Sequence, residues 1–149
     1  MSGHHGFIED MGIERGPFGD GKSVLWIEVG PQHMSPTKTV HGAVLYGLAD
    51  TTMGSAIWTL LSDGETCATI SCSIDYLRAV REGKIVCEAE VVSKGRRTAM
   101  ARAIIRDAAG DPVAQASASF WVGPVDERRA GKGEHRRRAA ASEKDASPR

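Results

Sequence analysis

The sequence predicts an α+β fold in which a curved antiparallel sheet wraps around one long central helix. Residues 42–61 form an apolar run that contains a single charged residue, Asp50. Four later segments alternate apolar and polar residues, as half-buried strands do, and short Gly-containing or charged connections join them. A helix that is apolar nearly all round must be covered on most of its sides, and a curled sheet provides that cover.

The N-terminal third of the chain is predicted to hold a short helix and one strand. We expect the helix near Phe7–Met11, followed by turns in the sequence GPFGDG. Ser23–Val29 alternates and is predicted to be the first strand. Residues 30–40 contain Pro31 and Pro36 and are predicted to form a loop.

The long helix is expected to span Gly42–Leu61, with Gly64 as its C-terminal cap. Four predicted strands follow it: Thr66–Leu77, Lys84–Ser93, Thr98–Arg106 and Val113–Val122. The first of these is expected to place one apolar set on one face, namely Ala68, Ile70, Cys72, Ile74 and Tyr76. Small alanines in the last two strands would let the sheet approach the helix closely. This outline is that of the hotdog fold.

Length and composition indicate one domain, expected over residues 23–125, with an N-terminal segment at 1–22. Residues 126–149 lack aromatic and β-branched residues and are predicted to be a disordered basic tail. The tail has eight Lys/Arg and five Asp/Glu, whereas the rest of the chain has eleven and fourteen. A slightly acidic body disfavours nucleic acid as a partner.

The cysteines and the N-terminus indicate a cytoplasmic protein. Cys67, Cys72 and Cys87 are odd in number and show no zinc-ligand spacing, so neither a disulfide framework nor a metal site is predicted. No apolar secretory signal is visible. A membrane span over residues 42–61 is disfavoured because Asp50 and several Thr, Ser and Gly residues would lie in the bilayer.

One motif suggests a different function, nucleotide binding. Gly16–Ser23 matches the P-loop pattern GxxxxGK[ST]. A P-loop needs a strand before it and a helix after it, so that the helix N-terminus faces phosphate. The residues after Ser23 alternate like a strand, and Asp20 would repel phosphate. A nucleotide site is therefore the weaker hypothesis.

The stronger candidate site is the helix start and its one carboxylate. A carboxylate within an apolar helix either stabilises the core or performs acid–base or nucleophilic chemistry. Gly42, at the helix start, offers an unhindered backbone N–H as an oxyanion donor. Asp50 lies eight residues later, roughly 12 Å along the axis. If both groups act on one carbonyl, they must come from different subunits, which predicts an obligate homodimer.

These residues resemble those of the PaaI-type acyl-CoA thioesterases of the hotdog superfamily. The resemblance begins at HG (His41–Gly42) and LAD (Leu48–Asp50). It extends through three further segments, IDYLRAV, KGRRTAMA and AQASASFWV, and covers about residues 23–122.

The resemblance implies a role for each matching residue. Asp50 would be the catalytic carboxylate, as general base or as nucleophile. Gly42 of the neighbouring subunit would polarise the carbonyl, and His41 would shape the helix start. Thr69 would orient water.

Other matching positions concern the substrate. The hairpin formed by Lys94, Gly95, Arg96 and Arg97 matches a hairpin that contacts the phosphates of coenzyme A, although an exposed cationic turn is the simpler interpretation. The family pattern NxxGxxHGG is changed at three positions, where Ser35 replaces Asn, Lys38 replaces Gly and Ala43 replaces Gly.

The implied function is metal-free hydrolysis of acyl-CoA without a cofactor, by a homodimer that assembles further into a dimer of dimers. The replacement of the family Asn by Ser35 leaves a second interpretation open, in which the protein binds an acyl-CoA or another acyl ligand without cleaving it.

Overall fold

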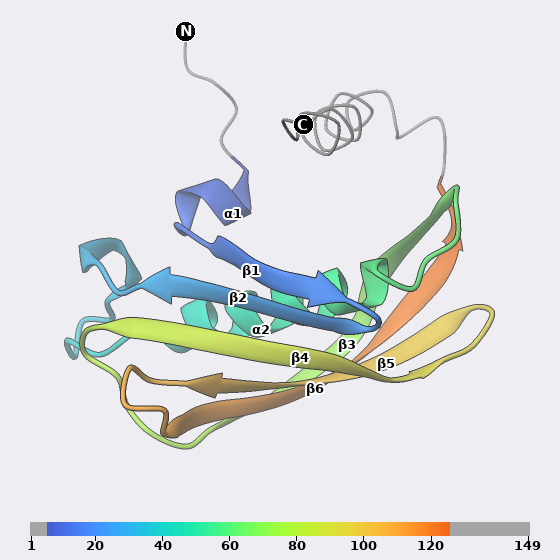
Figure 1. Ribbon diagram of the computed structural model, residues 1–149. Helices are drawn as coiled ribbons and strands as arrows, with labels where there is room; N and C mark the ends of the chain where they lie inside the picture. Colours follow the sequence, from blue (N-terminus) through green and yellow to red (C-terminus); the bar gives the residue numbers. More distant parts are fainter. Residues whose placement is uncertain (1–5, 126–149) are drawn as a thin grey trace, which may run out of the picture.

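The computed structural model describes residues 6–125, which form a six-stranded antiparallel sheet curled around one long helix (Figure 1). The helical elements are α1 (Phe7–Asp10), the 3-10 turn η1 (Pro31–His33) and α2 (Gly42–Trp58). The strands are β1 (Glu14–Gly19), β2 (Lys22–Glu28), β3 (Glu65–Tyr76), β4 (Lys84–Lys94), β5 (Thr98–Arg106) and β6 (Pro112–Pro124). Their order in the sheet is β1-β2-β4-β5-β6-β3. The predicted hotdog architecture is confirmed.

The core lies between α2 and the inner face of the sheet. Leu48, Met53 and Ile57 of α2 are fully buried there, and each contributes roughly 1.5–3 kcal/mol by its removal from water. The predicted alternation in β4, β5 and β6 is confirmed, and the inward alanines of β5 and β6 leave room for the helix. Within residues 6–125, no helix is long and apolar enough to cross a membrane.

The first strand was not predicted, because its Gly and Pro residues resemble turns. Of the sequence GPFGDG, residues 16–19 lie in β1. Phe18 and Gly19 pair with β2, and Gly16 and Pro17 form an irregularity between paired residues. The turn is confined to Asp20 and Gly21, whose φ angles of 51° and 75° both suit a tight two-residue hairpin. The P-loop match therefore lies in a β-hairpin and lacks the helix that phosphate binding needs. Part of the predicted N-terminal segment 1–22 thus belongs to the same sheet as the predicted domain.

The long helix ends three residues earlier than predicted, at Trp58. Thr59 is the C-terminal cap, and its hydroxyl donates to the carbonyl of Ala56 and accepts the N–H of Gly21, both at 2.7 Å. This side chain competes with continuation of the helix. The prediction that Gly64 is the C-terminal cap is wrong. Gly64 lies in the turn before β3, with φ 79°.

The predicted face of β3 is wrong in its first half because the strand contains a β-bulge. Thr69 pairs with Phe120 and Ser71 with Ser119, so Ile70 is an extra residue that points away from the helix. Before the bulge, the odd-numbered Thr69 faces α2, and after it the even-numbered Cys72 does.

The tail predicted at 126–149 lies outside the described residues, so its predicted disorder and basic character stay expectations from the sequence.

The loop before α2 contains a residue in an unfavourable backbone conformation. Lys38 has φ 58°, in a turn closed by its N–H on the carbonyl of Ser35. Glycine adopts this conformation without steric cost, so Lys38→Gly should raise the free energy of unfolding by about 0.5–1 kcal/mol. Denaturant unfolding measures the change. Thr37→Gly is the control: φ is not positive at residue 37, so this change should lower the free energy of unfolding. A lower free energy of unfolding for Lys38→Gly would show that the Lys38 backbone is not strained.

Candidate active site

The N-terminus of α2 presents a free backbone donor. His41 is the N-cap, and its Nδ1 accepts the N–H of Ala43 at 2.9 Å. Gly42 is the first helical residue, and its N–H has no acceptor among residues 6–125. The first N–H groups of a helix lie at the positive end of its dipole, so this group suits a developing oxyanion.

A buried histidine that sequence reasoning missed fixes the chain before α2. His33 accepts the N–H of Gly30 at Nδ1 and donates from Nε2 to the carbonyl of Met11, both at 2.9 Å. Its own carbonyl accepts the N–H of His41 at 2.8 Å. A lone histidine in a loop gives no sequence signal for this role. Its effect is to hold α1, the loop and the helix start in one arrangement.

Tyr76 closes over the helix start. Its hydroxyl donates to the carbonyl of Gly42 at 2.9 Å. A Cβ atom at residue 42 would lie 3.1 Å from the tyrosine ring, so any larger residue would push the ring aside. Glycine therefore leaves the N–H accessible and lets Tyr76 pack closely, whereas a larger residue would require the ring to shift slightly.

Asp50 lies two turns further along α2, and Thr69 of β3 holds its carboxylate. The threonine hydroxyl donates to Oδ1 of Asp50 at 2.7 Å. The sequence predicted that Asp50 is buried, whereas in the single chain it is half-buried. The second carboxylate oxygen, Oδ2, has no hydrogen-bond donor among residues 6–125. The structure thus brings Asp50 and Thr69 together and leaves one oxygen available for a substrate or water.

A third contact between α2 and β3 lies between the Gly42–Tyr76 contact and the Asp50–Thr69 contact. The hydroxyl of Tyr46 and the thiol of Cys72 lie close enough to affect each other's pKa. Three residues of α2 spaced four apart, at 42, 46 and 50, therefore each lie beside a residue of β3. The β-bulge makes this row complete, because it turns both Thr69 and Cys72 toward the helix. The alternating residue pattern of β3 does not indicate the bulge.

Two thiols border Asp50, and neither is a nucleophile at neutral pH. Burial, reinforced by the negative charge of Asp50, raises the pKa of Cys67 to about 11. Burial also raises the pKa of Cys72 despite the neighbouring Tyr46 hydroxyl, which lowers it. Thiolate is the reactive form of cysteine, so the carboxylate of Asp50 is the group suited to chemistry here.

Ser35, predicted to contact the substrate, lies in the loop before the helix. Its hydroxyl is 2.8 Å from that of Thr37 and 3.2 Å from that of Thr39. These three hydroxyls form a small exposed cluster in the turn that contains Lys38. The structure shows no contact between this cluster and Asp50.

The predicted phosphate-binding hairpin lies at the other end of the sheet from the start of α2 (Figure 1). Lys94 forms an ion pair with Glu65, with 3.9 Å between Nζ and Oε2. Gly95 closes the turn by donating its N–H to Thr98. Arg96 and Arg97 are exposed and have no ion-pair partner among the described residues. The hairpin and Asp50 are thus separate within one chain.

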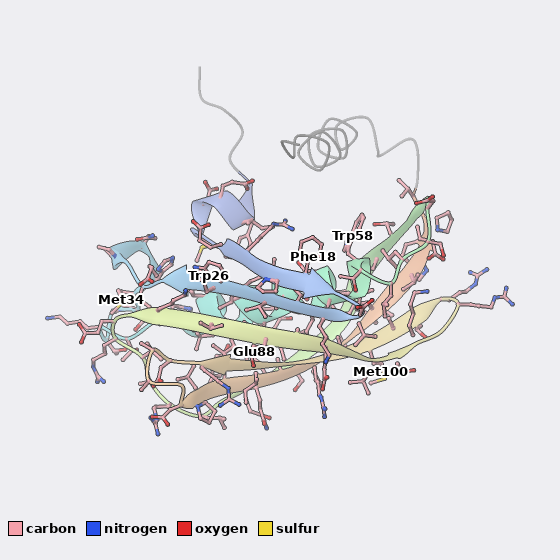
Figure 2. The ribbon with its side chains drawn as sticks, viewed as in Figure 1. Phe18, Trp26, Met34, Trp58, Glu88 and Met100 are labelled. Atoms are coloured by element: carbon pink, nitrogen blue, oxygen red, sulfur yellow. The ribbon has the colours of Figure 1, made fainter. Side chains whose placement is uncertain are left out.

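Two hollows lie on the surface. A pocket of about 330 Å³ lies beside Gly42 and is lined mainly by apolar side chains and Tyr76. A larger one, about 690 Å³, lies on the face of the sheet that carries Glu88 and Met100, away from α2 and Asp50 (Figure 2). No group of three or more His, Cys, Asp or Glu residues that could hold a metal ion exists within residues 6–125.

The charge of Asp50 should be measurable through the neighbouring thiol. Alkylation of Cys67 by iodoacetamide should be slow near pH 8 and increase as the pH approaches about 11. In Asp50→Asn the anionic neighbour is gone, so the thiol should ionise at lower pH and react faster at each pH below that value. Peptide mass spectrometry measures the rates. An unchanged pH profile of alkylation in the variant would show that the Asp50 carboxylate does not raise the pKa of Cys67.

Known proteins share this fold and part of this sequence. A family model described as the thioesterase superfamily matches residues 37–114, slightly more than half of the chain. A Haemophilus influenzae protein named "Putative esterase" is 32% identical over 90 residues, which are 60% of this chain and 64% of that protein. The chain thus spans just under two thirds of this curated relative, and 65% of a relative with the same name from Archaeoglobus fulgidus.

Solved structures agree with these matches. A thioesterase from Haemophilus influenzae superposes with a TM-score of 0.77 at 25% identity, over 82% of this chain and 85% of that one. A mutant of the phenylacetic acid degradation protein PaaI from Thermus thermophilus gives a TM-score of 0.71 at 29% identity, over 77% and 96%. By its family match and its PaaI-like structural neighbours, this chain belongs to the thioesterase superfamily.

Proposed function

We propose that the protein is an acyl-CoA thioesterase, which hydrolyses the thioester to a free acid and coenzyme A. The observation that carries this proposal is the Asp50 carboxylate, held by Thr69 with one oxygen available, two turns from the free N–H of Gly42. Thioester hydrolysis needs a base or nucleophile and an oxyanion donor. Membership of the thioesterase superfamily supports the same reaction.

The active unit in this proposal is a homodimer. Gly42 and Asp50 lie roughly 12 Å apart along α2, too far to act on one carbonyl within a chain. Strand β3 is an edge of the sheet and twelve residues long, so its outer side has unpaired backbone groups that a second copy can pair with. Each site would then combine Asp50 of one protomer with Gly42 of the partner subunit.

Two such dimers would associate further into a dimer of dimers. The outer face of the sheet carries exposed apolar side chains, among them Ile70, Val92 and Met100 (Figure 2 shows Met100). Exposed apolar residues that gather on one face are typical of a protein interface. This face is on the opposite side of the sheet from Asp50, so a second dimer could bind there without covering the proposed sites.

The reaction follows from these groups. The Asp50 carboxylate takes a proton from water as the water oxygen bonds to the thioester carbon, or it attacks that carbon itself and water then hydrolyses the anhydride. In both routes the carbonyl oxygen becomes an oxyanion that accepts the N–H of Gly42 of the partner subunit. The carbon–sulfur bond then breaks, and the coenzyme A thiolate takes up a proton.

The remaining predicted residues would bind and orient the substrate. Arg96 and Arg97 are exposed cations without ion-pair partners in the described chain, which suits the phosphates of coenzyme A. Lys94 would first have to leave Glu65. The Ser35 hydroxyl cluster, close in sequence to His41, would hydrogen-bond the thioester region in place of the family asparagine.

Replacing the carboxylate tests the proposal. Asp50→Asn should lower thiol release from a panel of short, medium, long and aromatic acyl-CoAs by about 10²–10⁴-fold, because the amide is neither base nor nucleophile. Asp75→Asn is the matched control, since Asp75 lies on β3 and contacts Gln115. Tight acyl-CoA binding in calorimetry without thiol release from the wild type would instead show a ligand-binding protein.

The oxyanion donor can be removed separately. Gly42→Pro deletes the N–H at the first helical position, where proline is well tolerated. Gly42→Ala keeps the N–H and introduces similar crowding against Tyr76. The proline variant should have a kcat lower than the alanine variant by roughly 10²–10³-fold. Equal kcat values for the two variants would show that the N–H takes no part.

A further inference from the structure

The proposed dimer fixes which residue of α2 lies on its two-fold axis. If Gly42 of one protomer lies opposite Asp50 of the other, symmetry places Asp50 of the first opposite Gly42 of the second. The two helices then run antiparallel, and the residue midway between, Tyr46, lies opposite its own copy. This step rests on the proposed function, because only a shared site pairs residues 42 and 50.

The position of Cys72 in strand β3 agrees with a two-fold axis that passes Tyr46. The Tyr46 hydroxyl lies beside the Cys72 thiol, so an axis that passes Tyr46 also passes close to Cys72. Cys72 lies near the middle of β3 (Glu65–Tyr76), so antiparallel pairing of two β3 edges around it would include residues 68–76 of both copies. An axis near either end of the strand would leave most of this long edge unpaired.

Tyr46 is also the bulkiest group between the two sites. On the uncovered side of α2, its neighbour Ala43 is small and Gly47 packs against Phe7 of α1, whereas the Tyr46 side chain is large and 38% exposed in the single chain. Asp50 is one helical turn away, about 6 Å along the axis. Two Tyr46 rings, each beside Cys72, would therefore fill the space between the two carboxylates.

We propose that the Tyr46–Cys72 pairs of both protomers meet on the two-fold axis and form the wall between the two active sites. Tyr46 is then a specificity-determining residue, because its ring limits the size of the acyl group that each site accepts.

The position of the axis is tested by cross-linking native cysteines. Residues directly opposite in an antiparallel pair have Cα atoms about 4.5–5.5 Å apart, within the range that a disulfide spans. Oxidation with diamide at alkaline pH, where a larger fraction of each thiol is thiolate, should give a covalent dimer with the wild type and with Cys67→Ser, and none with Cys72→Ser. Cys67 is the matched control, on the same strand and face.

The outcomes separate the two proposals. A sample that is dimeric by gel filtration but gives no Cys72 cross-link, or one that cross-links through Cys67, overturns the placement of the axis and leaves the shared site standing. A monomeric protein with full thioesterase activity overturns the shared site itself.

The role as a wall is tested by acyl-group preference. Tyr46→Ala should raise kcat/KM for the longest accepted acyl-CoA, relative to the shortest, by tenfold or more. Tyr46→Phe keeps the ring and should keep the wild-type ratio. The same ratio in all three proteins, or the same change in both variants, would show that the ring does not limit the acyl group.

Discussion

The structure depends on the burial of one apolar helix. Eight residues of α2 are buried against the sheet, and the sheet can approach because β5 and β6 present alanines at the contact. One chain covers only part of this helix. The side that stays uncovered carries Ala43, Tyr46 and the half-buried Asp50. The carboxylate that we propose as catalytic therefore lies where a second chain can complete its surroundings, on a helix whose other sides are packed in the core.

The contacts between α2 and β3 position the side chains of the candidate active site. The β-bulge at Ile70 changes the phase of the strand, so that Thr69 bonds Asp50 and Cys72 lies beside Tyr46 on the same face. Without the extra residue, one of these side chains would point to the outer face. Tyr76 and His41 secure the helix start while leaving the N–H of Gly42 free. Rigid placement of base and donor on regular elements is what electrostatic catalysis requires.

Much of the fold follows from local patterns, and the misses have physical causes. The strands β5 and β6 alternate over most of their length, as β4 does up to the irregularity at Val92, so their inward faces were predicted. In β3, apolar residues stand at 68, 70, 72 and 74 and suggest one unbroken face, which conceals the bulge. Gly16 and Pro17 resemble a turn, yet they lie in β1, between residues that pair with β2 on either side. Asp50, Gly42 and Thr69 could be proposed from the sequence, whereas Tyr76 and Cys72 enter the site only through contacts between distant segments.

The central claim is that each site combines residues of two subunits, and mixing two inactive variants tests it most directly. Asp50→Asn and Gly42→Pro are unfolded together, refolded and assayed for thiol release. In a mixed dimer, the Asp50 of the Gly42→Pro chain meets the intact N–H of the other chain, so one of its two sites is whole. Since about half of the dimers are mixed, the account predicts recovery of about one quarter of wild-type activity. No recovery above the sum of the two variants, in a sample shown to contain mixed dimers, would contradict the shared site.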